Sequence, residues 1–101
     1  MKTERFSAVL HEGHKEAAVE VPFDPATRWG LPATRLLPGR HGHRVQGRLN
    51  GLPMESAIVT RGDGFFLIIP DELKLAAGLV AGDTVQVTLH PHPPAGSSGP
   101  A

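Results

Sequence analysis

Apolar and polar residues alternate along several short segments of the chain, and this pattern is typical of strands that bury one face. Thr3–Leu10 and Ala17–Val21 alternate in this way, and Pro22 ends the second segment because proline donates no backbone hydrogen bond. A third segment, Phe65–Ile69, is apolar throughout and predicts a fully buried strand. The remaining predicted strands are His43–Asn50, Leu52–Thr60 and Thr84–His90.

Glycine-containing pairs separate several of these predicted strands. Asn50-Gly51 accepts the positive φ that both central positions of a type I′ hairpin turn require. Asp63-Gly64 predicts a second tight turn, and Gly82-Asp83 predicts the turn before the last strand. Leu31–His43 contains two prolines and two glycines, and we expect it to be an extended loop.

Two short helices are expected between the strands. Asp24 can cap a helical turn that ends with Trp29, and a second helix begins near Asp71. Gly78 suits the left-handed position that follows the second helix.

About six short strands with tight turns close most economically as a small barrel, because closure removes exposed strand edges. We therefore predict a mainly β fold, a small barrel capped by the two helices, with Trp29 sealing one end. The single domain is expected over residues 1–90. Residues 91–101 are rich in Pro, Gly and Ser and predict a disordered tail.

Composition narrows the classes of protein to consider. A chain of 101 residues is long enough for one domain with one core. It contains no Cys, which excludes disulfides, thiolate nucleophiles and Cys-based metal sites. The first residues lack the apolar core of a signal peptide, and the longest apolar run, Phe65–Pro70, is too short to span a bilayer. We expect a cytoplasmic protein that does not associate with membranes.

The formal net charge is zero, but the charges are unevenly distributed. Residues 25–54 carry five arginines and no acidic residue, so this segment is suited to contact an anion. The alternative is neutralisation within the fold, in which Arg44 and Arg48 pair across strands with carboxylates such as Glu20 or Glu55.

The candidate ligand-binding residues lie in and just before the predicted strand His43–Asn50. Arg44 and Arg48 fall on one side of that strand, opposite its apolar residues. Arg40, His41 and His43 adjoin them, and protonated histidines would add positive charge at mildly acidic pH. We expect a weak site here for a small anionic ligand or an acidic protein partner.

Metal binding and catalysis have weaker support. The pair His41-x-His43 on a strand would present two imidazoles to a zinc ion, and these are the residues to expect if a metal binds. No spacing supplies a convincing third ligand, so we expect solvated histidines and no metal or cofactor. The serines lack nucleophile-elbow glycines, and no glycine-rich phosphate loop follows a strand. We expect no catalytic residue and no enzyme activity.

The chain resembles a small bacterial domain of unknown function, whose relatives are sometimes fused to a YdeI/OmdA-like domain. The matching positions cover most of residues 3–90. They are Pro22, Phe23, Asp24, Gly30, Val45-x-Gly47, Asn50-Gly51, Gly64, Leu73-Lys74, Gly78 and Gly82-Asp83-x-Val85-x-Val87. The resemblance implies a double-split β-barrel capped by helices, distantly similar in fold to AbrB/MazE-type regulators, and it implies no activity.

Two classes of function follow from these observations. The first is a non-enzymatic binding or accessory module that acts as a monomer or weak homodimer on a small anionic ligand or a protein partner. The second is a nucleic-acid-binding regulator of the AbrB/MazE type, which would act as a dimer. The net-neutral chain lacks the basic character typical of nucleic-acid binding and favours the first class.

Overall fold

The computed structural model describes residues 3–12, 16–37 and 40–92, which form seven strands and two helices. In chain order these are β1 (Glu4–Glu12), β2 (Ala17–Val21), α1 (Pro25–Trp29), β3 (Thr34–Leu37), β4 (Arg40–Leu49), β5 (Leu52–Arg61), β6 (Gly64–Ile69), α2 (Asp71–Ala77) and β7 (Thr84–Pro91).

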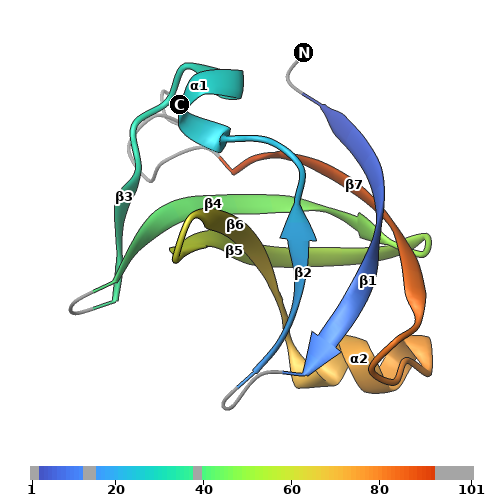
Figure 1. Ribbon diagram of the computed structural model, residues 1–101. Coiled ribbons are helices and arrows are strands. Elements are labelled where there is room, and N and C mark those ends of the chain that lie inside the picture. Colours follow the sequence, from blue (N-terminus) through green and yellow to red (C-terminus); the bar gives the residue numbers. More distant parts are fainter. Residues whose placement is uncertain (1–2, 13–15, 38–39, 93–101) are drawn as a thin grey trace.

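Six of the strands close into a barrel, which confirms the predicted fold class. Neighbouring strands follow the order β4-β5-β6-β2-β1-β7, and pairing between β4 and β7 completes the circle. All of these pairs are antiparallel. Among the described strands, the seventh, β3, pairs with β4 alone and lies at one side of the barrel (Figure 1).

The core of the barrel consists of the inward-facing half of each strand. Val19, Leu49, Leu67, Val85 and Leu89 are completely buried, and each belongs to a different strand except the last two. β7 alternates between buried and more exposed residues as predicted, whereas β2 has one exposed residue, Glu20, among four buried ones. Burial of these side chains supplies the main favourable free energy of folding.

The two helices lie on opposite sides of the barrel (Figure 1). The Asp24 carboxylate caps α1 by accepting a hydrogen bond from the Ala26 amide at 3.0 Å. At the end of α1, Trp29 is only 1 % exposed and packs edge-on against Phe23, with ring centroids 5.4 Å apart. Trp29 therefore belongs to the core at the α1 end, as expected.

The expectation of a loop over Leu31–His43 is wrong, because β3 and the start of β4 form a hairpin there. Thr34 pairs with Gly42, and Arg35 pairs with His41. Gly42 serves close packing rather than a turn: a Cβ atom at this position would lie 2.1 Å from the Ile58 carbonyl oxygen. Gly42 is therefore required by close packing against β5, although in the sequence it contributed to a pattern that is typical of a loop.

Two details of β6 also differ from expectation. The turn before it is Gly62-Asp63 rather than Asp63-Gly64, because Gly64 already pairs with Arg61. Gly62 has a φ of +60°, which fits the first central position of a type II′ turn. The strand itself is not fully buried: Leu67 and Ile69 face the core, while Phe65, Phe66 and Ile68 are partly exposed.

Other local predictions agree with the structure. Asn50 and Gly51 both have positive φ, as the type I′ turn requires, and Gly78 has a φ of +66° after α2. β7 continues to Pro91, one residue past the predicted end of the strand. Residues 93–101, which include most of the predicted tail, lie outside the described residues. None of the described helices has the length and apolar character needed to cross a membrane.

Candidate functional site

The two arginines of the predicted site lie on the outward face of β4. Arg44 and Arg48 are exposed, whereas Val45 and Leu49 between and beside them are buried in the core. This arrangement follows from strand geometry, since successive side chains point to opposite faces. On the adjoining strands the outward neighbours are Ala57, Glu55 and Pro53 of β5, and Thr88 and His90 of β7, followed by His92.

Neither Arg44 nor Arg48 is engaged by a carboxylate among the described residues. The guanidinium group of Arg48 donates to the Gly51 carbonyl oxygen at 3.0 Å. The carboxylate of Glu55, which the alternative placed beside the arginines, forms no ion pair with a described residue. Glu20 is paired in register with Phe66 on the β2–β6 side of the barrel.

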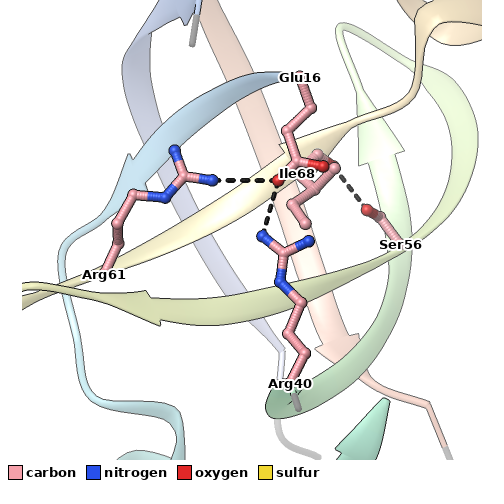
Figure 2. Close-up of polar contacts among 5 residues, drawn as sticks. All are labelled: Glu16, Arg40, Ser56, Arg61 and Ile68. Atoms are coloured by element: carbon pink, nitrogen blue, oxygen red, sulfur yellow. Dashed lines mark hydrogen bonds and ion pairs between the residues drawn. The ribbon is translucent and has the colours of Figure 1, made fainter. Parts of the chain in front are cut away.

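Arg40, by contrast, has a carboxylate partner. Its guanidinium donates to Glu16 Oε2 at 2.7 Å, and Arg61 donates to the same oxygen at 3.0 Å (Figure 2). The Arg61 guanidinium also lies over the ring of Phe66, 5.7 Å from its centroid. One carboxylate therefore holds two arginines that come from β4 and β5.

A hollow of about 380 Å³ lies beside Arg44 on the outside of the barrel, and we call it the outer groove. Its lining is mainly apolar and includes Leu36 of β3, Ala57 and Val59 of β5, and Ile68 of β6. Charged and polar side chains complete the lining: Arg40, Arg44, Glu55, Ser56 and His92.

The outer groove lies where β5 separates from β6. These strands pair from Arg61 and Gly64 as far as Ile58 and Leu67, and the ladder ends there. Beyond this point the Ser56 hydroxyl donates to the Ile68 carbonyl oxygen at 2.5 Å and links the diverging strands (Figure 2). A side-chain hydrogen bond thus takes the place of the next backbone bond, and β5 is left free to curve away with β4.

The two histidines of the predicted site do not join the arginines. His41 is exposed and paired with Arg35 of β3. His43 is buried, its Nε2 lies 2.8 Å from the Leu31 carbonyl oxygen, and its ring packs edge-on against Trp29. His43 therefore ties the segment after α1 to the barrel, and one imidazole of the pair is buried while the other is exposed.

The predicted site did not include His90 and His92, the pair of histidines that does adjoin the arginines of β4. His90 is paired in register with Gln46, and the His92 amide donates to the Arg44 carbonyl oxygen at 2.9 Å. The signal was present in the alternation of β7, because Thr84, Gln86 and Thr88 occupy the outward positions and His90 and His92 continue the series. Within the described part of the chain, three or more His, Asp or Glu residues never gather closely enough to hold a metal ion.

A second, more open hollow of about 470 Å³ flanks Arg48. Its lining includes Gln46, Arg48, Glu55 and His90. Glu55 lines both hollows, so one carboxylate stands between the two arginines of β4. The face as a whole offers hydrogen-bond donors for an anion, with a single acidic group in its middle.

Comparison with known proteins assigns the chain to a family but not to an activity. The family model described as "Domain of unknown function (DUF1905)" matches residues 6–89, which include the whole barrel except the ends of β1 and β7. A search of curated proteins finds no match. The match confirms the resemblance to a small domain of unknown function.

Proposed function

The chain belongs to the DUF1905 family of domains of unknown function, and we propose that it acts as a non-enzymatic binding module for an anionic ligand. The site is the outward face of β4, with Arg44 as its main cation. The observation that carries this proposal is that Arg44 lines the outer groove while no described carboxylate engages its guanidinium group.

The chemistry of the outer groove supports binding rather than catalysis. Ser56 supplies its hydroxyl, and that hydroxyl already donates to the Ile68 carbonyl oxygen. A nucleophilic serine needs a neighbouring base to accept its proton, and no described side chain forms that hydrogen bond with Ser56. Guanidinium and imidazole groups, in contrast, are the usual partners of carboxylates, sulfonates and phosphates.

Charge also favours a small anion over a nucleic acid. Binding to a nucleic-acid backbone takes several Lys or Arg contacts with successive phosphates. The face of β4 offers Arg44 and Arg48 with Glu55 between them, so a polyanion that spans both arginines would pass a carboxylate. A nucleic-acid-binding regulator therefore remains the alternative function, and binding experiments can distinguish the two.

The proposal is tested by titrating sodium pyrophosphate and heparin into the protein at low ionic strength by isothermal calorimetry. The Arg44→Gln/Arg48→Gln variant should bind both anions more weakly, and added salt should weaken binding because exposed charges are screened over about 8 Å at physiological ionic strength. Arg28→Gln is the matched control, since Arg28 pairs with Glu4 and does not line either hollow.

Equal and negligible binding of these two anions and of an organic sulfonate by all three proteins would overturn the proposal. Tight, strongly salt-dependent binding of duplex DNA that is lost in the double variant would instead support the nucleic-acid regulator.

A further inference from the structure

We infer that the outer groove takes a monoanion with an apolar body, such as an aromatic or branched aliphatic carboxylate or sulfonate. This inference rests on the proposed function and specifies the class of ligand. The anionic group would lie at Arg44, and the apolar body would lie on the floor formed by Leu36, Val59 and Ile68.

The apolar floor is unusual for the outward face of a barrel. Ile58 faces the core, so Val59 takes the outward position beside it, yet Val59 is only 2 % exposed. Leu36 of β3 approaches Gly42, the register partner of Val59, and Leu36 and Val59 both line the outer groove, so β3 contributes to this burial. The Leu36 Cδ1 atom lies 3.0 Å from the place of a Cβ atom at Gly42, so the absence of that side chain lets β3 cover this face.

The size of the outer groove suits a small organic molecule. Its volume of about 380 Å³ is within the range of roughly 300–1,000 Å³ that is typical of ligand pockets. A lining that is mainly apolar with a few charged groups is also typical of such pockets, because apolar contacts supply affinity and the charged groups fix orientation.

The charges around the outer groove favour one negative charge on the ligand. Two guanidinium groups line it, but Glu16 already accepts a hydrogen bond from Arg40, and Arg44 is the one without a carboxylate partner in the described chain. Glu55 lies on the same outward face, diagonal to Arg44 across the β4–β5 pair. A ligand with several negative charges would meet the Glu55 carboxylate, whereas a monoanion can place its charge at Arg44 and its apolar part away from both.

The test uses two fluorescent probes of nearly the same shape. 8-Anilinonaphthalene-1-sulfonate is an aromatic monoanion, and N-phenyl-1-naphthylamine is the same ring system without the sulfonate. We expect saturable binding of the sulfonate at one site per chain and weaker binding of the neutral probe. Arg44→Gln should weaken sulfonate binding about tenfold, because it removes a charge-assisted hydrogen bond, and should leave the neutral probe nearly unaffected.

Two further variants locate the bound probe. Ala57→Leu adds a larger side chain to the lining of the outer groove, so it should weaken the binding of both probes. Glu16→Gln removes the carboxylate that holds Arg40 and should strengthen sulfonate binding. Arg28→Gln is the matched control of equal charge, since Arg28 pairs with Glu4 and lines neither hollow, and it should change the affinity less than twofold.

The outcomes separate this inference from the proposed function. Sulfonate binding that is unchanged in both Arg44→Gln and Ala57→Leu would overturn the inference. If pyrophosphate binding still depends on Arg44 and Arg48 in that case, the proposed anion-binding module stands without its apolar ligand. Absence of binding by every anion tested would overturn both.

Discussion

Two glycines of the β4–β5 hairpin are required for different physical reasons. A Cβ atom on Gly47 would lie 1.8 Å from the Thr88 carbonyl oxygen, so this residue allows the backbones of β4 and β7 to approach closely. Gly51 has open space around its Cα atom but a φ of +86°, which L side chains rarely adopt. The first glycine is fixed by a distant strand and the second by its own turn.

Gly47→Ala should therefore destabilise the protein by about 2 kcal/mol or more, because β4 and β7 must move apart where they close the barrel. Gly51→Ala should cost only about 1 kcal/mol, the usual penalty for a left-handed residue other than glycine. Urea denaturation of the two variants beside the wild type measures the difference. Equal effects would mean that the β4–β7 contact adjusts without strain.

Most features of the fold that depend on neighbouring residues were predictable from the sequence, although the turn before β6 was placed one residue too late. Residues set by distant contacts were not predictable. The structure confirms the predicted helix cap at Asp24, the turn at Asn50-Gly51 and the helix end at Gly78. Each of these features depends only on residues a few positions away in the sequence. Gly42 resembled a loop residue, because the carbonyl of Ile58 that excludes its side chain belongs to another strand. For His43 the sequence predicted a solvated side chain next to the ligand-binding arginines. Its burial was not predictable, because Leu31 and Trp29 contact it only in the folded chain.

At the scale of elements, the separation of β5 from β6 is the feature that shapes the candidate site. The Ser56 hydroxyl holds the diverging strands together through the Ile68 carbonyl oxygen. Sequence patterns indicated both strands but not the place where their pairing ends. Likewise, the arginines of β4 were predictable from alternation, whereas the apolar floor beside them required β3, which was expected to be a loop.

Ser56→Ala should destabilise the protein by about 1 kcal/mol, because it leaves a partly buried carbonyl oxygen without its donor. Ser56→Thr keeps the hydroxyl and should lose less. Ser7→Ala is a control on an exposed strand position, where the hydroxyl donates only to the Gln86 side chain. Thermal unfolding followed by circular dichroism compares them, and a Ser56→Ala midpoint equal to that of Ser7→Ala would contradict the structural role of Ser56.

The contact between α2 and the end of β1 has a consequence for stability at alkaline pH. The Lys74 ammonium donates a hydrogen bond to the Glu12 carboxylate, and this bond raises the pKa of Lys74 above its ordinary value of 10.5. A raised pKa means that the folded protein holds this proton more tightly than the unfolded chain. The stabilisation is therefore complete below pH 10.5 and is lost as the pH rises through the higher pKa of the folded state.

We expect the thermal midpoint of the wild type to fall more steeply above pH 10.5 than that of Lys74→Gln, which lacks the titrating group. The two proteins are compared from pH 8 to pH 11.5 at constant ionic strength. The effect should be small, since the pair is partly exposed to solvent. Parallel curves would show that the Lys74–Glu12 contact does not stabilise the folded state.

At the scale of the whole molecule, the end of β7 closes the barrel against β4. Pro91 is paired with Val45, and the His92 amide donates to the Arg44 carbonyl oxygen at 2.9 Å. Arg44, Val45 and His92 also line the outer groove, so residues that complete the barrel contribute to the candidate site.

Removal of residues 93–101 should leave the thermal midpoint unchanged, since their Pro/Gly/Ser-rich composition predicts no packing. Removal of residues 91–101 also deletes the last contacts between β7 and β4 and should lower the midpoint, by about 4–8 °C for each kcal/mol lost in a domain of this size. Scanning calorimetry of the two truncated chains measures both values. A large loss in the shorter deletion would show that the predicted tail packs against the barrel.

The closure of the barrel by β1, β7 and β4 also determines when the chain can fold. The Ser7 hydroxyl bonds to the side chain of Gln86, 79 residues further along the chain, and this contact belongs to the β1–β7 pair. Such contacts give a high contact order, which slows folding towards milliseconds to seconds. During synthesis, β1 and β4 must keep one edge unpaired until β7 has left the ribosome. Throughout that interval the nascent chain carries two open strand edges that can pair with other chains.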